Sequence, residues 1–351
     1  CRSWSQLMRV GFVVNVTGAT DSGLTTYQLA ASLCSAGHET WFVSPGNFAL
    51  DEDGTIRGYA RGVSARRFSS PSAFLAALNG ADRLQRWIVL ESLDLLWLRS
   101  NPFALKGWAQ EASQDFARLA AQRGVTVVND PVGLAHASSK LYVESFPEEI
   151  RPRTLITRRL SRIERFLADE GTIVLKPVRG FGGRGVFKLS RDNRANLEQI
   201  VRSIGRDGYV VAQEYLSGAE RGDTRLFLMN GVPLEHKGVY AVVDRVRTGE
   251  DLRNNVHAGG EVRPARMNDA LARVAALVRP RLVADGMFFV GLDVVGDKLL
   301  EVNVFSPGGL GSVQQLERVD FTRAVTADLE RKTQRIREVG GDLPNRDRAM
   351  L

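Results

Sequence analysis

Apolar and polar residues alternate along the first third of the chain in blocks that predict strand, helix and strand in turn. The β-branched run Val10–Asn15 predicts a strand, and the apolar spacing over Ser22–Ala36 predicts a helix that ends at Gly37. Further strands are predicted at Glu39–Ser44, Trp87–Leu90, Leu95–Leu98 and Val125–Val128, and a helix at Trp108–Arg123. This rhythm is typical of a parallel sheet covered by helices, so we expect residues 8–130 to form an open α/β domain.

After Pro131 the pattern changes to α+β with antiparallel pairing. The predicted helices are Ser138–Phe146, Ser161–Glu170, Asn196–Ile204, Asn268–Ala284 and Phe321–Lys332. The predicted strands are Thr154–Thr157, Thr172–Pro177, Gly185–Leu189, Tyr209–Glu214, Thr224–Met229, Pro233–Val243, Phe288–Val294 and Leu299–Val304. Asn230-Gly231 is typical of a tight hairpin turn. We expect units over 131–216 and 217–331, a charged segment over 332–351 that forms a frayed helix or a tail, and residues 1–7 as an extension outside the fold.

The composition excludes several classes of protein. With 351 residues, 44% hydrophobic and 25% charged, the chain has the composition of an ordinary globular protein. Its apolar runs fall short of the roughly 18 residues that a membrane-spanning helix needs. Two cysteines, Cys1 and Cys34, argue against a disulfide framework. We therefore expect a reducing, cytoplasmic environment.

The formal charge of +7 permits an anionic small molecule, an acidic surface or nucleic acid as partner. The densest basic segment, Arg151–Phe166, contains six arginines. It lacks the interleaved aromatic residues of a base-stacking platform, so we interpret it as a solvated face. We expect no nucleic-acid or membrane partner.

A glycine cluster, RGFGGRG, matches the pattern G-x-G-x-x-G with glycines at positions 180, 182, 183 and 185. A dinucleotide-binding fingerprint must be followed by a helix, whereas VFKL continues here as a strand. The Gly-Lys-Ser/Thr ending of a phosphate-binding P-loop is also missing. A flexible hairpin tip is the ordinary alternative, but Lys176 supplies a cation beside the loop. We therefore predict a flap whose backbone N–H groups close over phosphates.

Two predicted strands near the C-terminus carry carboxylates. Glu301 and Asn303 are two residues apart and so point to one face, which by itself is typical of a solvated strand. We predict a three-residue loop, Val295–Asp297, that pairs Asp293 with Leu299 and brings Asp293 to the same face; a two-residue turn would point it to the opposite face. Two carboxylates and an amide oxygen suit Mg²⁺ bound together with nucleotide phosphates.

Two further segments carry weaker signals. The strand Tyr209–Leu216 offers extended backbone groups for an adenine edge, with Asp223 placed for ribose hydroxyls. The loop 246–260 contains Arg247 and Arg253 and has no core-forming pattern. Most such loops are surface connections, but an arginine-rich loop beside a phosphate flap is a candidate transition-state clamp.

The joint order of these motifs resembles the ATP-grasp superfamily and, within it, the bacterial glutathione synthetase family. The resemblance covers about Met8 to Leu329 and is carried by Lys140, LKP, the glycine flap, QEYL, GDTRLFL, RNNVHAGG and GLDVVGDKLLEVNVFSP. It implies an ATP-grasp fold with a glycine-rich lid subdomain after the N-terminal domain. It also implies an ATP-dependent carbon–nitrogen ligase that forms an amide through an acyl phosphate.

The resemblance implies a role for individual residues. Phosphates would be bound by Lys140, Lys176, Gly182 and Gly183, adenine by Gln213, Glu214, Tyr215 and Leu216, and ribose by Asp223. The reacting groups would be surrounded by Arg225, Arg245, Arg253 and Asn255. Magnesium, with manganese as the alternative, would be held by Asp293, Glu301 and Asn303. Substrates would lie at Arg99, Gly259, Gly260, Ser306 and Pro307.

The family's reaction joins γ-glutamylcysteine and glycine at the expense of ATP. This chain departs from the family where the substrates would lie. Leu98–Pro102 keeps the arginine of an Arg-Lys-Asp-Pro-Pro motif but lacks its lysine and acid. After the metal strand the family reads Ser-Pro-Thr, whereas this chain reads Ser-Pro-Gly and continues with glycines to Gly311. A ligase for a different amino acid or peptide pair is one alternative, and a catalytically silent nucleotide-binding protein is another. We further expect small-molecule substrates and a homo-oligomer.

Overall fold

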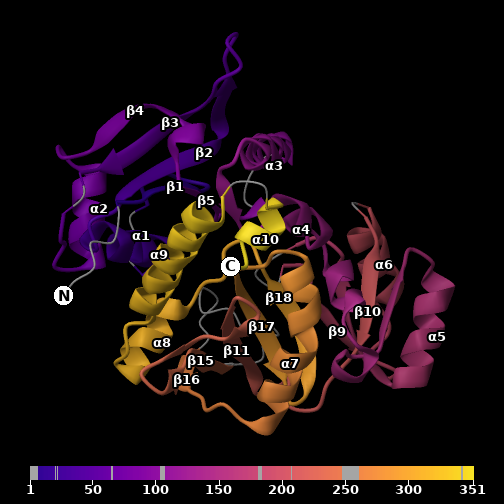
Figure 1. Cartoon of the computed structure of the whole chain (residues 1–351). Helices are drawn as coiled ribbons and strands as arrows, with labels where there is room; N and C mark the ends of the chain where they lie inside the picture. The colour runs from indigo at the N-terminus through magenta and orange to yellow at the C-terminus, as the bar shows by residue number, and fades with distance from the viewer. Residues whose placement is uncertain are drawn as a thin grey trace.

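The computed structural model describes residues 7–19, 21, 23–64, 66–102, 107–180, 184–206, 208–246, 261–340 and 343–351. Three units follow one another along the chain (Figure 1). An N-terminal sheet in indigo and purple is followed by a small sheet in magenta and red and then by a sheet in orange. The yellow C-terminal helices return to lie between the N-terminal sheet and the orange one.

The N-terminal unit is a six-stranded sheet in the order β4-β3-β2-β1-β5-β6. Its strands are β1 Arg9–Val13, β2 Glu39–Leu50, β3 Ile56–Val63, β4 Leu84–Val89, β5 Leu95–Leu98 and β6 Thr126–Val128. Strands β2, β1, β5 and β6 pair in parallel, which confirms the predicted parallel sheet. Strands β3 and β4 add an antiparallel edge, of which only the end of β4 was predicted, as the strand Trp87–Leu90. The reason is that β2 continues beyond Ser44 through an irregularity between Val43 and Phe48 into a hairpin.

Helices cover both faces of this sheet. They are α1 Thr25–Ser35, α2 Pro71–Asn79 and α3 Gly107–Gln122. Phe12 and Phe42 stack beneath α1 and α2 with ring centroids 5.4 Å apart, whereas Phe48 stacks on Phe116 of α3 on the other face. Because α1 follows β1 directly, its N-terminus lies at the carboxyl edge of the parallel strands, where open α/β sheets form their ligand crevice.

The connection to the second unit is partly helical. Helix α4, Pro131–His136, begins where the first domain was predicted to end, because the Asp130 side chain accepts hydrogen bonds from the backbone N–H groups of Val132 and Gly133. The short helix predicted around Ser138–Phe146 is confirmed over most of its length and is a 3-10 helix. The structure forms 3-10 helices at Lys140–Ser145 and Glu148–Ile150.

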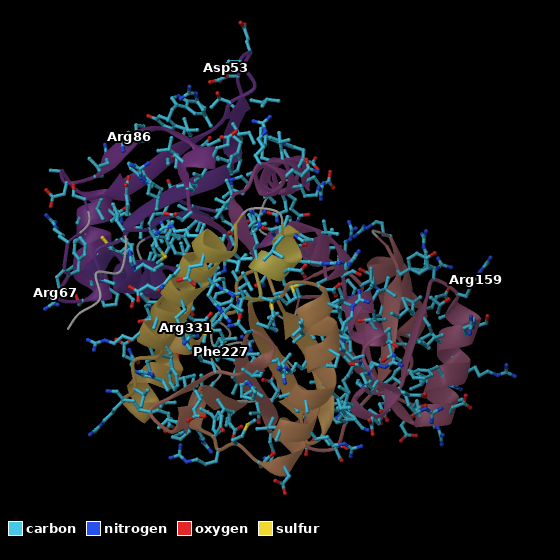
Figure 2. All side chains as sticks on the ribbon, in the orientation of Figure 1. Asp53, Arg67, Arg86, Arg159, Phe227 and Arg331 are labelled. Carbon is cyan, nitrogen blue, oxygen red and sulfur yellow. The ribbon has the colours of Figure 1, made fainter. Side chains whose placement is uncertain are left out.

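The second unit is a four-stranded antiparallel sheet in the order β7-β10-β8-β9. Its elements are β7 Thr154–Thr157, α5 Leu160–Glu170, β8 Thr172–Pro177, β9 Phe187–Ser190, α6 Leu197–Gly205 and β10 Val210–Glu214. Along β8, Ile173 and Leu175 are buried in the core, whereas Val174 and Lys176 point to the opposite face. Arg159, at the start of α5, lies on the outer edge of this unit (Figure 2).

The third unit is an antiparallel sheet in the order β16-β15-β11-β17-β18, as predicted for the second half of the chain. Its strands are β11 Gly222–Met229, β12 Val232–Pro233, β15 Val242–Val246, β16 Glu261–Pro264, β17 Phe289–Val295 and β18 Lys298–Asn303, with β13 Glu235–His236 and β14 Val239–Tyr240 as a separate pair. Asn230-Gly231 forms the predicted hairpin turn, with φ values of 52° and 73°. The single strand predicted over Pro233–Val243 is wrong, because a turn at Lys237-Gly238 interrupts it. Phe227 of β11, labelled in Figure 2, lies in the core.

The C-terminal helices differ most from the sequence-based expectation. They are α7 Asp269–Ala284, α8 Leu310–Glu317, α9 Phe321–Val339 and α10 Asn345–Arg348. Helix α7 is as predicted and is capped by Asn268, whereas α8 was not predicted. Helix α9 extends beyond Lys332, and the segment expected to be a frayed helix or a tail instead packs against the N-terminal unit. None of the helices in the described part of the chain combines the length and apolar character that crossing a bilayer requires.

The docked tail is held by one asparagine and one arginine. Strand β6 lies at an edge of its sheet, and the Asn345 side chain bonds both the N–H and the C=O of Val127 there, at 2.8 and 2.9 Å. Arg348 donates to the carbonyl groups of Ala121 and Gly124 at the end of α3. The tail therefore occupies hydrogen-bonding groups that the sheet edge would otherwise expose.

We predict that Asn345→Ala lowers the free energy of unfolding by about 2 kcal/mol, because it leaves two partly buried backbone groups of Val127 without partners. Urea denaturation of the full chain measures this change. Arg346→Ala, at the exposed neighbouring position, is the control and should shift the transition little. Equal stability of the two variants would contradict the role of Asn345.

Candidate functional site

A cleft of about 770 Å³ opens where the three units meet. The N-terminal unit contributes Asp21, Thr25 and Asn101, the second unit Lys176, Gln213 and Leu216, and the third Arg225, Asp293 and Glu301. Lys140, on the connecting 3-10 helix, lines the same cleft. Residues from distant parts of the chain thus face one shared space.

Two lysines approach one side of this cleft. Lys140 Nζ donates to the carbonyl of Gly180 at 2.9 Å, and Lys176 Nζ donates to Oε1 of Gln213 at 3.0 Å. Burial lowers the pKa of Lys140 and lowers that of Lys176 to about 8, while the nearby carboxylate of Glu301 opposes both shifts. The two ammonium groups therefore lie close to Glu301, although Lys140 is on the connecting 3-10 helix, Lys176 is in the second unit and Glu301 is in the third.

The end of β10 and the two residues that follow it form the neighbouring wall. Gln213, Glu214, Tyr215 and Leu216 all line the cleft, as their predicted shared role requires. The backbone N–H groups of Glu214 and Tyr215 bond to Arg153 and Thr172, which keeps the chain extended there. Lys188 of β9 lies 3.7 Å from the centroid of the Tyr215 ring and so links the second strand of the predicted flap to this wall.

Two arginines and two aspartates form a buried ion-pair network across three adjacent strands. Arg225 of β11 forms a bidentate pair with Asp293 of β17. Arg245 of β15 lies 2.8 Å from Asp293 and 2.6 Å from Asp223. Burial opposes ionisation of Asp293, yet Arg225 and Arg245 lower its pKa to about 2. The two aspartates in turn raise the pKa of Arg245.

The predicted carboxylate face is present, but the predicted hairpin register is wrong. The turn is the two-residue Gly296-Asp297, with Gly296 at φ 61°, as a type II′ turn requires. Asp293 nevertheless lies opposite Glu301, because a bulge leaves Leu300 as the extra residue of β18. The bulge shifts the register by one residue, which returns both carboxylates to the face of Asn303.

This face fits a divalent cation only together with further ligands. Asn303 Nδ2 donates to Asp293 Oδ2 at 3.1 Å, and Glu301 pairs with Asp293 across the two strands. Within the described residues, no group of three His, Cys, Asp or Glu side chains is placed to hold a metal ion by itself. Arg245 keeps its bonds to Asp223 if Asp293 turns to another partner. The donor set therefore suits a hard cation that also carries phosphate ligands.

The other end of the cleft lies between the N-terminal unit and the segment after β18. Ser306, Gly308 and Gly309 line it, facing Thr25 at the start of α1. Arg99 and Pro307, both predicted to contact substrate, are instead buried behind this wall. Asn101, from the predicted substrate motif Leu98–Pro102, lines the cleft, and so do Asp21 and Thr25, which the sequence did not mark.

Several predicted site residues lie outside the described residues. They are Gly182, Gly183, Arg253, Asn255, Gly259 and Gly260, together with Arg247 of the same loop. The described segments on either side, β8 with β9 and β15 with β16, each form an antiparallel pair next to the cleft.

Solved structures with this architecture are ATP-grasp enzymes. The ATP-grasp ligase PsnB, complexed with a phosphomimetic variant of its minimal precursor, Mg and ADP, aligns with a TM-score of 0.59 at 18% identity, covering 93% of this chain and 100% of that one. The D-cycloserine synthetase DcsG aligns with a TM-score of 0.56 at 17% identity, covering 91% and 99%. At this identity the likeness shows the fold alone, which is that of the ATP-grasp class of ATP-dependent ligases.

Family profiles and sequence relatives narrow the class. Profiles described as prokaryotic glutathione synthetase match residues 8–135 for the N-terminal domain and 139–318 for the ATP-grasp domain. Glutathione synthetase of Agrobacterium fabrum is 29% identical over 321 residues, 91% of this chain and 94% of that protein. That of Thermosynechococcus vestitus is 34% identical over 239 residues, 68% and 71% of the two chains. The chain belongs to the prokaryotic glutathione synthetase family, and membership implies ATP use with a divalent metal ion.

We predict that Asp293→Asn lowers the free energy of unfolding at pH 7 by roughly 3 kcal/mol, because Arg225 loses its buried counter-charge. The low pKa of Asp293, about 2 against 3.8 normally, makes its contribution complete above pH 4 and lost as the pH falls towards 2. Urea denaturation of both proteins across this range measures the difference.

Asp297→Asn is the control for this variant, since Asp297 lies in the same hairpin with its side chain 61% exposed. It should change stability by less than about 0.5 kcal/mol. A stability difference at Asp293 that does not shrink in acid would show that its ionisation is not the cause.

Proposed function

We propose that this protein is a glutathione synthetase that joins γ-glutamylcysteine to glycine with the conversion of ATP to ADP and phosphate. The observation that carries the proposal is the meeting of Lys140 and Lys176 with Glu301 and Asp293 across one cleft, within a chain of this family. The lysines supply positive charge for phosphate groups, and the carboxylates supply oxygen ligands for a cation.

The proposed nucleotide site follows the cleft from one unit to the next. Adenine lies against Gln213 to Leu216, and the triphosphate extends to Lys140 and Lys176 beneath the flap that contains Gly182 and Gly183. Asp223 is the proposed ribose contact. Its ion pair with Arg245 limits the room for this role, because the Asp223 carboxylate already accepts a bond of 2.7 Å.

The proposed metal ligands are Asp293, Glu301 and Asn303, and Mg²⁺ is the ion that their oxygens suit best, with Mn²⁺ as the alternative. Bound there, the cation would neutralise charge on the phosphates. The lysines on the opposite wall provide the same kind of neutralisation from the protein's own side chains.

The reaction is a phosphoryl transfer followed by an acyl transfer. The cysteinyl carboxylate of the dipeptide attacks the γ-phosphate, and the glycine amine then displaces phosphate from the acyl phosphate. Arg225 and Arg245, with Arg253 and Asn255 in the neighbouring loop, are placed by the proposal around the charge that develops. Such chemistry requires placement and charge neutralisation, with no protein nucleophile.

A second candidate is a ligase for a different amino acid or peptide pair. Asn101 and Gly308 line the substrate end of the cleft at positions where the family motifs carry other residues. Changed side chains at this end alter which carboxylate and amine fit, whereas the nucleotide end keeps its motifs. Under either candidate function the substrates are small molecules. The homo-oligomer and the lack of a nucleic-acid partner stay predictions.

The test is ADP release by the purified protein with γ-glutamylcysteine and a panel of amino acids. We expect turnover that requires both the dipeptide and glycine, and a loss of at least about 100-fold in kcat for Asp293→Asn, which removes a charge from the phosphate site. Turnover with γ-glutamylcysteine and another amino acid, but not with glycine, would favour the second candidate. ADP release that needs no amine would remove the ligase assignment, and no release with this dipeptide and any amino acid would remove the assignment as glutathione synthetase.

We predict that ATP affinity decreases as the pH rises through about 8, because Lys176 has a pKa of about 8 and only its protonated form attracts phosphate. Binding should raise this pKa, so the complex takes up protons near pH 8. Calorimetry in two buffers of different ionisation enthalpy measures the uptake. Lys176→Arg, which stays protonated, should bind ATP without this pH dependence. Wild-type affinity that is constant from pH 7 to 9.5 would contradict the assignment.

A further inference from the structure

Arg99 occupies an unusual position directly after β5. Its side chain is buried, with 3% of the residue exposed. Nε donates to Oγ1 of Thr26 at 3.0 Å, and Nη2 donates to the carbonyl of Pro307 at 3.2 Å. Nη1 is buried and has no hydrogen-bond partner among the residues that the structure describes. The guanidinium thus joins the N-terminal unit to the segment that follows β18.

No carboxylate among the described residues pairs with this guanidinium. It lies over the rings of Trp97 and Phe289, at 5.5 and 5.6 Å from their centroids. Burial alone lowers the pKa of Arg99 to about 9. Burying a positive charge that no described carboxylate neutralises makes folding less favourable. The hydrogen bonds of Arg99 to Thr26 and Pro307 therefore serve a purpose other than stability.

The segment that Arg99 holds is also held from the opposite side. Arg225 Nη1 donates to the carbonyl of Gly308 at 3.0 Å, while the rest of its guanidinium binds Asp293. Gly291 permits this arrangement, because a Cβ there would lie 3.0 Å from Pro307 and 3.1 Å from Arg225. Successive carbonyl groups of one loop are therefore bound by arginines from two different units.

The same contact brings two helix starts together. The backbone N–H of Leu310, the first residue of α8, donates to Oγ1 of Thr25, the first residue of α1, at 3.3 Å. Gly311 lies so close to α1 that an added Cβ would be 2.4 Å from Nε2 of Gln28. Thr25, Gly309 and other residues of these two starts form opposite walls of the cleft's substrate end.

We propose that Arg99 is a positioning residue that fixes the first turn of α1 against the loop 306–309 and so sets the shape of the substrate end of the cleft. This inference rests on the proposed ligase function and departs from the role expected of Arg99 as a direct substrate contact. Arg99 and its partners Thr26 and Pro307 lie behind the wall. Their chain neighbours Thr25, Ser306 and Gly308 line the cleft and are the residues that would meet the substrate.

The geometry of the guanidinium explains why lysine cannot replace it. Arginine reaches Thr26 and Pro307 with two different nitrogens of one planar group. Lysine carries a single ammonium on a flexible stem and does not hold the same two partners in a fixed relation. Arg99→Lys therefore keeps the charge but loses the connection between the two units, whereas Arg99→Met loses both.

The kinetic test compares each substrate with its amide. γ-Glutamylcysteine amidated at the α-carboxylate of its glutamyl residue, and glycinamide in place of glycine, each lack a carboxylate that takes no part in the reaction. We expect Arg99→Lys to raise KM by about tenfold or more, by the same factor for substrate and amide, since misplaced walls affect both. The dissociation constant for ATP should stay within about twofold of the wild-type value. A KM penalty that disappears with either amide would show direct contact with that carboxylate and overturn the proposal.

Arg348→Met is the matched control. Arg348 is also a buried arginine that donates to backbone carbonyl groups, those of Ala121 and Gly124, but it lies away from this cleft. Its loss should lower thermal stability and leave both KM values within about twofold of wild type. If Arg348→Met raised KM as much as Arg99→Lys does, a general loss of stability would be enough to raise KM. That result would overturn the proposal.

Hydrogen exchange separates this inference from the proposed function. In Arg99→Lys and Arg99→Met, amides in the first turns of α1 and α8 should exchange at least about tenfold faster, while Arg348→Met leaves these turns unchanged. If the wild-type protein turns over no peptide and amine, the proposed function fails, yet exchange still decides the role of Arg99. Unchanged exchange in both turns for Arg99→Lys would contradict that role.

Discussion

The carboxylate of Asp293 is the constraint on which the rest of the site depends. It is buried between Arg225 and Arg245, and both arginines belong to neighbouring strands of the same antiparallel sheet. A charge in this position is stable only when its partners are held in place, because the surrounding core cannot solvate it. The strand register, the bulge at Leu300 and the small residue Gly291 all serve that requirement.

From this carboxylate the connections run outward into all three units. Arg225 extends to the loop at Gly308, and Arg99 reaches the adjoining Pro307 from the N-terminal unit. On the opposite side, Glu301 lies near the lysines of the second unit. The regions proposed for nucleotide, cation and substrate are therefore connected by a short series of charged contacts. A change in one of them alters the geometry at the others.

The sequence predicted those site residues whose positions follow from local pattern. Lys176 lies on a strand whose apolar neighbours, Ile173 and Leu175, face the core, so its direction follows from the two-residue period. Glu301 and Asn303 share a face for the same reason. Thr25 escaped prediction because nothing in its own sequence neighbourhood marks it; its place in the cleft comes from the turn between β1 and α1. The hairpin register was wrong because a one-residue bulge has no strong sequence signal.

The sequence by itself determined the class of protein. The order of a lysine-bearing strand, a glycine flap and an acidic hairpin indicates this class even where a detail such as the hairpin register is predicted wrongly. It also determined most helices and strands, since these depend on local periodicity. Only the tertiary structure decided which charges pair, that Arg99 is covered by the cleft wall, and that the C-terminal tail packs on β6. These contacts join residues far apart in the chain, and their free energy depends on burial and orientation that exist only once the units have packed together.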